Sequence, residues 1–238
     1  MRDRLFVALD VETLDDAGAL LDKLDGAVAG VKIGSQLFTA AGPAAVELAR
    51  KRGYRVFLDL KFHDIPNTVA GAVRGATRLG VFMLNVHASG GADMMRAAAE
   101  AATRAAQDYT VTRPICLAVT VLTSLDRRTL QREVGVASSV ESHVLALAER
   151  AHAAGLDGCV ASPQEIRRVR LALGPRFAIV TPGIRAGAGL TDDQKRVATA
   201  SDAIRAGADY LVIGRPITGA ADPRAAATAI LGELGTAT

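Results

Sequence analysis

The chain has 238 residues, of which 50% are hydrophobic and 22% are charged. This length and composition are typical of a globular protein with a large core, and they exclude a largely disordered chain. The formal net charge is only +3, and like charges do not gather in blocks. This balance argues against a nucleic acid or a membrane as the main partner.

Short apolar runs alternate with stretches of helical spacing along the whole chain. The runs predicted to be strands cover residues 5–9, 28–33, 55–60, 81–86, 114–121, 158–161, 177–181 and 209–213. The stretches predicted to be helices cover residues 14–24, 35–52, 66–79, 91–107, 140–154, 163–173, a part of 192–206, and 223–234. Strands rich in Val, Ile, Leu and Ala that alternate with helices predict a parallel sheet covered by helices.

Eight such units predict an α/β fold, a (β/α)8 TIM barrel that occupies residues 1–238 as a single domain. A doubly wound open sheet is the alternative. It normally has fewer strands and often carries the motif G-x-G-x-x-G after the first one. The first strand here ends at Asp10 without that motif, so the sequence favours the barrel.

Two features bear on where the protein works. Met1 is followed almost at once by the first apolar run, and no apolar run is long enough to cross a bilayer. Cys116 and Cys159 lie inside apolar runs without the spacing of a metal site, so we expect buried, reduced thiols. Together these features predict a cytoplasmic protein.

Polar side chains recur where predicted strands end. These residues are Asp10, Lys32, Asp59, Lys61, His87, Thr123, Arg185 and Arg215. Active sites of TIM barrels lie at the carboxyl ends of the strands, on the loops that follow them. The sequence therefore predicts one site built from many loops, with His87 interpreted as a hydrogen-bonded residue at a strand end.

Residues 55–69 read RVFLDLKFHDIPNTV and place charges in a buried strand. Because strand side chains alternate, Asp59 and Lys61 are predicted to share the face that carries Phe57. Unpaired buried charges cost several kcal/mol, so the pair is either a structural salt bridge or part of a catalytic network with Lys32. Asp64 fits such a network, and it also fits a helix-entry position before Ile65 and Pro66.

A second pattern lies in the loops after the seventh and eighth strands, where TIM barrels commonly bind phosphate. Gly183 and Gly214 allow backbone N–H groups to approach an anion, and Arg185 and Arg215 each supply a guanidinium. Gln194 can add an amide. The alternative is that these are ordinary turn glycines beside surface arginines.

The stretch from Asp59 to Thr68, DLKFHDIPNT, resembles the signature of the orotidine 5′-phosphate decarboxylase family. Further matches to the family occur in order along the chain: Ala8-Leu-Asp10, Val31-Lys32-Ile-Gly34, Val121-Leu-Thr123-Ser, Thr181-Pro-Gly-Ile-Arg185, Gln194 and Ile213-Gly-Arg215-Pro. The long signature is specific, whereas Asp-x-Lys-x-x-Asp alone is shared with related sugar-phosphate decarboxylases and synthases.

The resemblance implies that orotidine 5′-monophosphate is converted to UMP and carbon dioxide, in de novo pyrimidine synthesis, without a cofactor or a metal. It implies that Lys61 protonates C6 of the substrate, that Asp59 lies beside the substrate carboxylate, and that Lys32 bridges Asp59 and the ribose. It also implies a homodimer in which Asp64 enters the site of the neighbouring subunit.

The resemblance further implies a set of residues that bind the substrate. Besides the four charged residues, these are Asp10, Ile65, Thr68, Thr123, Pro182, Arg185, Gln194, Gly214 and Arg215. Asp10 and Thr68 are assigned to the ribose, and Thr123 to the base. Arg185, Gln194, Gly214 and Arg215 are assigned to the phosphate.

Three alternatives stay open on the sequence. One is a metal-assisted sugar-phosphate decarboxylase or synthase of the same barrel superfamily, in which Asp59 and Asp64 help to hold magnesium. Another makes Lys61 a Schiff-base lysine of an aldolase. The third is a barrel that binds a phosphate ligand without catalysis.

Overall fold

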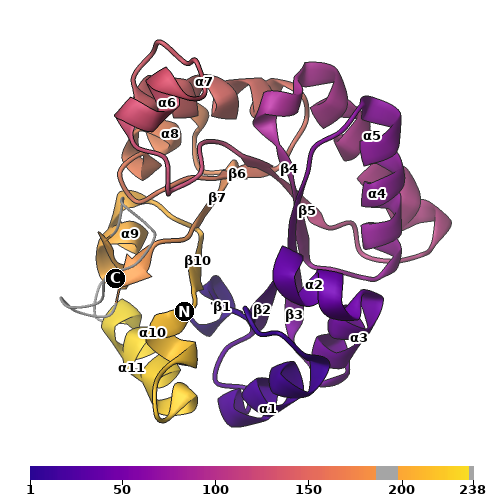
Figure 1. Ribbon diagram of the computed structural model, residues 1–238, viewed down its shortest axis with the longest axis vertical. Helices are drawn as coiled ribbons and strands as arrows, with labels where there is room; N and C mark the ends of the chain where they lie inside the picture. The colour runs from indigo at the N-terminus through magenta and orange to yellow at the C-terminus, as the bar shows by residue number, and fades with distance from the viewer. Residues whose placement is uncertain (186–197, 236–238) are drawn as a thin grey trace.

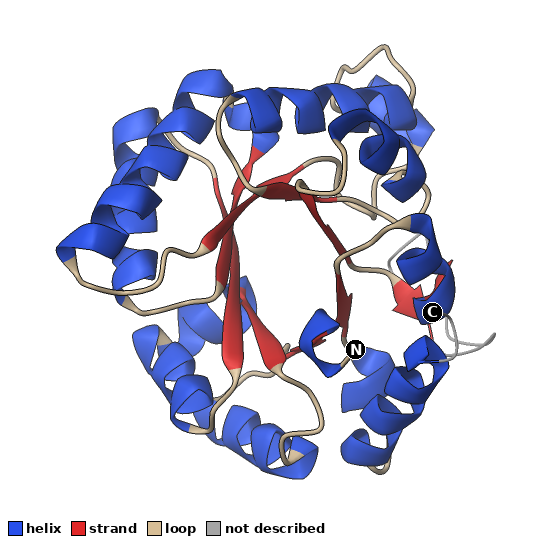
Figure 2. Cartoon of the chain, turned by 180° about the vertical axis from the view of Figure 1, so that it is seen from behind, coloured by secondary structure: helices blue, strands red, loops and turns tan. Residues whose placement is uncertain are grey.

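The computed structural model describes residues 1–185 and 198–235. Within them, a closed ring of parallel strands is surrounded by helices (Figure 1 and Figure 2). The strands of the barrel are β1 (Leu5–Ala8), β2 (Gly30–Gly34), β3 (Arg55–Phe62), β4 (Met83–His87), β5 (Ile115–Val119), β6 (Gly158–Val160), β7 (Ala178–Thr181) and β10 (Tyr210–Ile213). The predicted (β/α)8 TIM barrel is confirmed.

The strands follow one another around the barrel in chain order, and β10 closes it by pairing with β1. The helices outside the barrel are α1 (Leu14–Leu24), α2 (Ser35–Ala41), α3 (Pro43–Lys51), α4 (Pro66–Arg78), α5 (Ala92–Asp108), α6 (Arg127–Arg132), α7 (Val140–Ala153), α8 (Ile166–Leu173), α9 (Ala200–Ala206), α10 (Arg215–Thr218) and α11 (Pro223–Gly235). Short 3-10 turns occupy Arg2–Arg4 and Ala88–Gly90. A separate pair of two-residue strands, β8 (Ile184–Arg185) and β9 (Ala198–Thr199), lies beside the barrel.

Some predicted helices differ from those observed. The helix expected over residues 35–52 is two helices, because Gly42 ends α2 with φ 59° and Pro43 begins α3. The long polar connection after β5 contains α6, whose amino end is capped by the side chain of Asp126. A helix was expected somewhere within residues 192–206: residues 200–206 form α9, residues 198–199 form β9, and residues 192–197 lie outside the described residues.

The core has two layers. The outward faces of the strands pack against the helices in one large apolar cluster. A second cluster fills the inside of the barrel and contains Phe6, Ala8, Phe57, Met83, Leu117, Val180 and Val212. The barrel is therefore packed with side chains and is not a pore, so that only its mouth is free for a ligand. Within the described residues, no helix is both long and apolar enough to span a membrane.

Candidate active site

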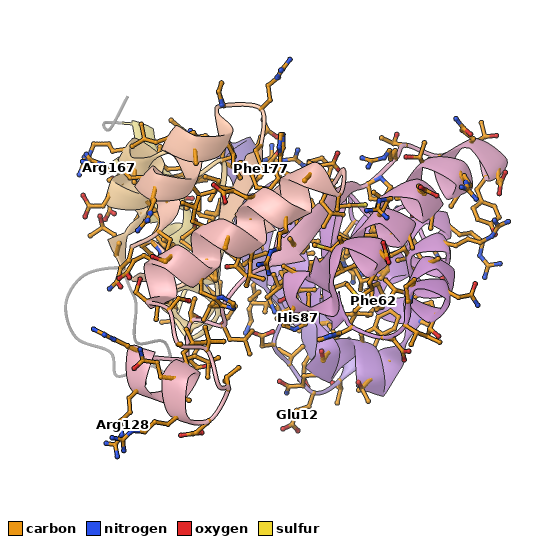
Figure 3. The ribbon with its side chains drawn as sticks, turned by 90° about the horizontal axis from the view of Figure 1, so that it is seen from above. Glu12, Phe62, His87, Arg128, Arg167 and Phe177 are labelled. Atoms are coloured by element: carbon orange, nitrogen blue, oxygen red, sulfur yellow. The ribbon has the colours of Figure 1, made fainter. Side chains whose placement is uncertain are left out.

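The connections that follow the strands gather at one end of the barrel. Glu12 and Arg128, which lie in the connections after β1 and β5, point toward the same end in Figure 3, whereas Phe177, just before β7, lies toward the opposite end. A cavity of about 360 Å³ opens among the connections after the strands. Nine residues predicted for the site line this cavity: Asp10, Lys32, Asp59, Lys61, Thr123, Pro182, Gly183, Gly214 and Arg215. Its floor is formed by apolar side chains that include Phe57, Val160 and Val212.

Four of the charged residues form a chain of alternating sign across the cavity. The ammonium nitrogen of Lys32 lies 2.9 Å from Oδ1 of Asp10 and 3.5 Å from Oδ2 of Asp59. The ammonium of Lys61 lies 2.7 Å from Oδ1 of Asp59. Lys32 and Asp59 are each only 9% exposed, and each has neighbours of opposite charge, which offset the cost of burying a charge. The predicted network is thus formed within a single chain, except for Asp64.

The position of Lys61 depends on an irregularity in β3. Phe57 and Leu58 pair with Met83 and Leu84 of β4, but the next pair is Phe62 with Val86. Residues 59–61 therefore lie opposite Asn85 alone, and Lys61 adopts a φ of 52° that side-chain-bearing residues rarely adopt. The expectation that both charges share one face is confirmed, but a bulge and not simple alternation sets the geometry.

The bulge is held by Asn85, a residue that the sequence analysis missed. Oδ1 of Asn85 accepts a hydrogen bond from the backbone N–H of Lys61 at 2.8 Å, and its Nδ2 donates to Oδ1 of Asp59 at 2.7 Å. Asn85 is fully buried. The signal was present in the sequence, since residues 81–86, VFMLNV, contain a single polar side chain, and a buried amide needs hydrogen-bond partners.

Gly34 leaves the space that the ammonium of Lys32 occupies. A Cβ atom at residue 34 would lie 2.9 Å from Nζ of Lys32 and 3.5 Å from Oδ1 of Asp10. Carbon and nitrogen cannot approach so closely without displacement. A side chain at this position would therefore push the ammonium away from its carboxylate partners.

His87 lies at the end of β4, half-buried, with its ring centroid 5.5 Å from that of His63. Burial lowers the pKa of His87 below its usual value of 6.5, and the nearby His63 and Lys61 lower it further. His87 is therefore a neutral neighbour of the charge network at neutral pH. Its expected hydrogen bond stays a prediction.

The structure does not bring Asp64, Ile65 or Thr68 to the cavity of their own chain. All three are exposed on the connection from β3 to α4 or on the first turn of α4. Oδ1 of Asp64 accepts a hydrogen bond from the N–H of Ile65 at 2.6 Å, and Ile65 is 67% exposed. These residues are thus available to contact another molecule.

The predicted phosphate side of the cavity is described in part. Gly183, with a φ of 79°, and Gly214 line the cavity, and Arg215 follows at its rim as an exposed residue. Arg185 is described only for its backbone, in β8. Gln194 lies outside the described residues.

Among residues 1–185 and 198–235, no group of three or more His, Cys, Asp or Glu side chains is arranged to hold a metal ion. In the cavity, the carboxylates of Asp10 and Asp59 both contact lysine ammonium groups. Both of these carboxylates are thus paired with ammonium groups of the same chain.

Residues 3–230 match the model of the family described as "Orotidine 5'-phosphate decarboxylase / HUMPS family". The chain belongs to this family.

The similarity extends over nearly the whole chain. The chain is 55% identical to "Orotidine 5'-phosphate decarboxylase" of Moorella thermoacetica over 233 residues, which cover 98% of this chain and 92% of that protein. It is 50% identical to the protein of the same name from Trichlorobacter lovleyi, with 98% and 95% covered. The crystal structure of orotidine 5'-phosphate decarboxylase from Lactobacillus acidophilus superposes with a TM-score of 0.87 at 38% identity, covering 98% of this chain and 99% of that one.

Proposed function

We propose that this protein is an orotidine 5′-phosphate decarboxylase, which converts orotidine 5′-monophosphate to UMP and carbon dioxide. The observation that carries the proposal is the chain of ion pairs Asp10–Lys32–Asp59–Lys61, whose two central residues are buried, at the mouth of a barrel of this family. Relatives that it matches over nearly their whole length, at 50–55% identity, bear that enzyme's name. The ligand is a small molecule, and the site belongs to a carbon–carbon lyase.

In the proposed reaction, Lys61 is the proton donor. The bond between C6 and the carboxylate carbon breaks, and its electron pair stays on C6 as carbon dioxide leaves. The ammonium of Lys61 stabilises this negative charge as it develops and then gives C6 a proton. The neutral amine regains its proton from solvent, so atoms and charge balance without a cofactor.

Asp59 has two roles in this proposal. Its Oδ1 holds the ammonium of Lys61 at 2.7 Å, so that the proton donor stays in place between turnovers. The carboxylate also lies on the side where the substrate carboxylate is expected, and the repulsion between the two is relieved as carbon dioxide forms. Lys32, between Asp10 and Asp59, pairs with the second oxygen of Asp59 and is placed to contact the ribose.

Recognition of the nucleotide is assigned to the rest of the cavity. Asp10 binds the ribose, Thr123 contacts the base and Pro182 lines the pocket. Gly214 and Arg215 bind the phosphate, together with Arg185 and Gln194. Binding energy from the distant phosphate is available to stabilise the transition state at C6.

The exposed residues of the β3–α4 connection are assigned to a neighbouring subunit. We infer a homodimer in which Asp64, Ile65 and Thr68 complete the partner's site. This assignment is supported by their exposure and by their absence from the lining of their own cavity. Location in the cytoplasm and a single domain over residues 1–238 stay predictions.

The test is a spectrophotometric assay that follows loss of orotidine 5′-monophosphate absorbance, with and without EDTA. We expect equal turnover in both. Turnover that is lost on chelation and restored by magnesium would instead support a metal-assisted sugar-phosphate enzyme. Tight binding of UMP in a calorimeter without any turnover would support a binding protein.

A further inference from the structure

The catalytic lysine, Lys61, is held at its backbone N–H and at its ammonium group, and the buried Asn85 is hydrogen-bonded to both the backbone and the partner of the ammonium. The side chain of Lys61 lies 2.7 Å from Asp59 Oδ1, and its backbone N–H lies 2.8 Å from Asn85 Oδ1. Asn85 Nδ2 lies 2.7 Å from the same oxygen of Asp59. These three hydrogen bonds close a ring through Lys61, Asp59 and Asn85.

We infer that Asn85 is a positioning residue for the decarboxylation, an inference that rests on the proposed function. It sets where the ammonium of Lys61 lies by fixing both the backbone of Lys61 and the rotation of the Asp59 carboxylate. Asn85 is fully buried and does not line the cavity. It therefore acts on the substrate only through its two neighbours.

The backbone of Lys61 needs this support. In a regular parallel pair, the N–H of a strand residue is bonded to the neighbouring backbone. The bulge in β3 interrupts the pairing between Leu58 and Phe62, and the side chain of Asn85 supplies the acceptor for Lys61 instead. The amide thereby stabilises a left-handed conformation, φ 52°, that residues with a side chain rarely adopt.

The NH2 group of the Asn85 amide holds the carboxylate of Asp59. Oδ1 of Asp59 accepts from both Asn85 and Lys61, while Oδ2 faces Lys32 at 3.5 Å. With Oδ1 held by a neutral donor, the carboxylate cannot rotate to pair both oxygens with one lysine. Lys61 thus stays paired with Oδ1 and Lys32 with Oδ2, and the two ammonium groups occupy separate positions along the cavity.

Few side chains other than asparagine meet these demands. The position requires one acceptor for an N–H and one donor for a carboxylate, on a short side chain without charge. Aspartate supplies the acceptor but places a second carboxylate against Asp59 when it is ionised. Leucine has a similar volume but supplies neither group.

The test compares Asn85→Leu and Asn85→Asp with the wild type, by steady-state kinetics and by calorimetry with UMP. We expect kcat of Asn85→Leu to fall about 10- to 100-fold, because a misplacement of about 1 Å in a reacting group costs about 100-fold. KM and the affinity for UMP should stay within about threefold, since Asn85 does not touch the ligand.

Asn85→Asp adds a readout that a purely structural role would not give. A protonated carboxyl can both donate to Asp59 and accept from the N–H of Lys61, as the amide does. Two carboxyls that share a site also hold a proton to higher pH. The ratio of mutant to wild-type kcat should therefore rise for Asn85→Asp as the pH falls from about 8 to about 6, and should stay flat for Asn85→Leu.

Thr77→Val is the matched control. Thr77 is also fully buried, and its hydroxyl donates to the carbonyl of Val73 within α4. Its replacement should lower stability without changing kcat or the pH ratio. If Asn85→Leu does not fold, Asn85→Asp and its pH ratio decide the question.

Three results would overturn the inference. They are an unchanged kcat in a folded Asn85 variant, a flat pH ratio for Asn85→Asp, and a loss of UMP affinity as large as the loss of kcat. A wild-type protein that does not consume orotidine 5′-monophosphate would instead refute the proposed function itself.

Discussion

At the scale of single residues, the site depends on where two ammonium groups lie. Lys61 is held by a carboxylate oxygen at 2.7 Å and through its backbone by Asn85. Lys32 is held between Asp10 and Asp59, and Gly34 leaves the room that its ammonium occupies. Lysine suits the proposed role of residue 61 because, unlike arginine, it can release its proton.

Lys61→Ala tests the proposed proton donor. Without the ammonium, C6 loses both the stabilising charge and the source of its proton, so kcat should fall by at least about 1,000-fold. UMP should still bind, because the contacts to ribose and phosphate remain. Stopped-flow or long-time absorbance assays measure the first effect and calorimetry with UMP the second. A mutant with mildly reduced kcat would refute the role.

Gly34→Ala tests the close approach to Lys32. The new methyl group would displace the ammonium, which is the end of a flexible side chain, so the fold should survive while kcat falls about 10-fold or more. Gly232→Ala on α11 is the control, since a Cβ atom there meets nothing within 4 Å. Urea unfolding and kinetics on both variants make the comparison. Equal kinetics for the two variants would show that Lys32 tolerates displacement.

At the scale of elements, we propose that β3 and the connection that follows it serve two sites. The carboxyl end of the strand places Asp59 and Lys61 in the cavity of its own chain. A few residues later, Asp64 and Ile65 point to the outside of the same chain. A symmetric dimer places the same segment of each subunit at the shared interface, so one short segment can contribute to both sites.

Mixing inactive subunits tests this arrangement. Lys61→Ala and Asp64→Ala homodimers should each be nearly inactive. A heterodimer should have one complete site, made of Lys61 from one subunit and Asp64 from the other. After equal mixing and subunit exchange, activity should recover to about a quarter of the wild-type value, since half of the dimers are mixed and each has one site of two. No recovery, with exchange verified by mass, would show that Asp64 acts within its own chain.

At the scale of the whole molecule, the barrel brings residues that are distant in sequence together around one cavity. Its two cysteines are buried outside the lining of that cavity. Cys116 and Cys159 are both fully buried, as the sequence analysis expected. Burial raises the pKa of each thiol from 9.0 to about 12. Both thiols therefore stay protonated in the folded protein well above the pH at which they ionise in the unfolded chain.

This difference predicts a loss of stability at high pH. The contribution of the thiols to stability is complete below pH 9.0 and is lost as the pH rises from 9.0 toward about 12, because only the unfolded chain releases the protons. The free energy of unfolding should fall by up to about 1.4 kcal/mol per pH unit for each thiol in that range. Urea unfolding from about pH 8 to about pH 10.5 measures it. A Cys116→Ala/Cys159→Ala variant should show a shallower decline, and parallel profiles would contradict the prediction.

The sequence by itself determined the order of strands and helices, the closed barrel they imply, and the group of charges at the strand ends. These follow from local apolar periodicity and from a rule of the fold, since all parallel strands end at the same mouth. The apolar pattern on both sides of Gly42 and Pro43 favoured one long helix where the structure has α2 and α3, and the Gly-Pro pair was the sequence signal for the break.

Only the tertiary structure decided how the charges meet. The bulge that positions Lys61 is held by Asn85, which is 24 residues away in the chain, and Asp59 is held by the same amide. The space for Lys32 depends on the missing side chain of Gly34, and Asp64 turns away from its own cavity. Each of these features depends on which residues folding brings into contact. Local sequence patterns do not give the distances between residues that are far apart in the chain.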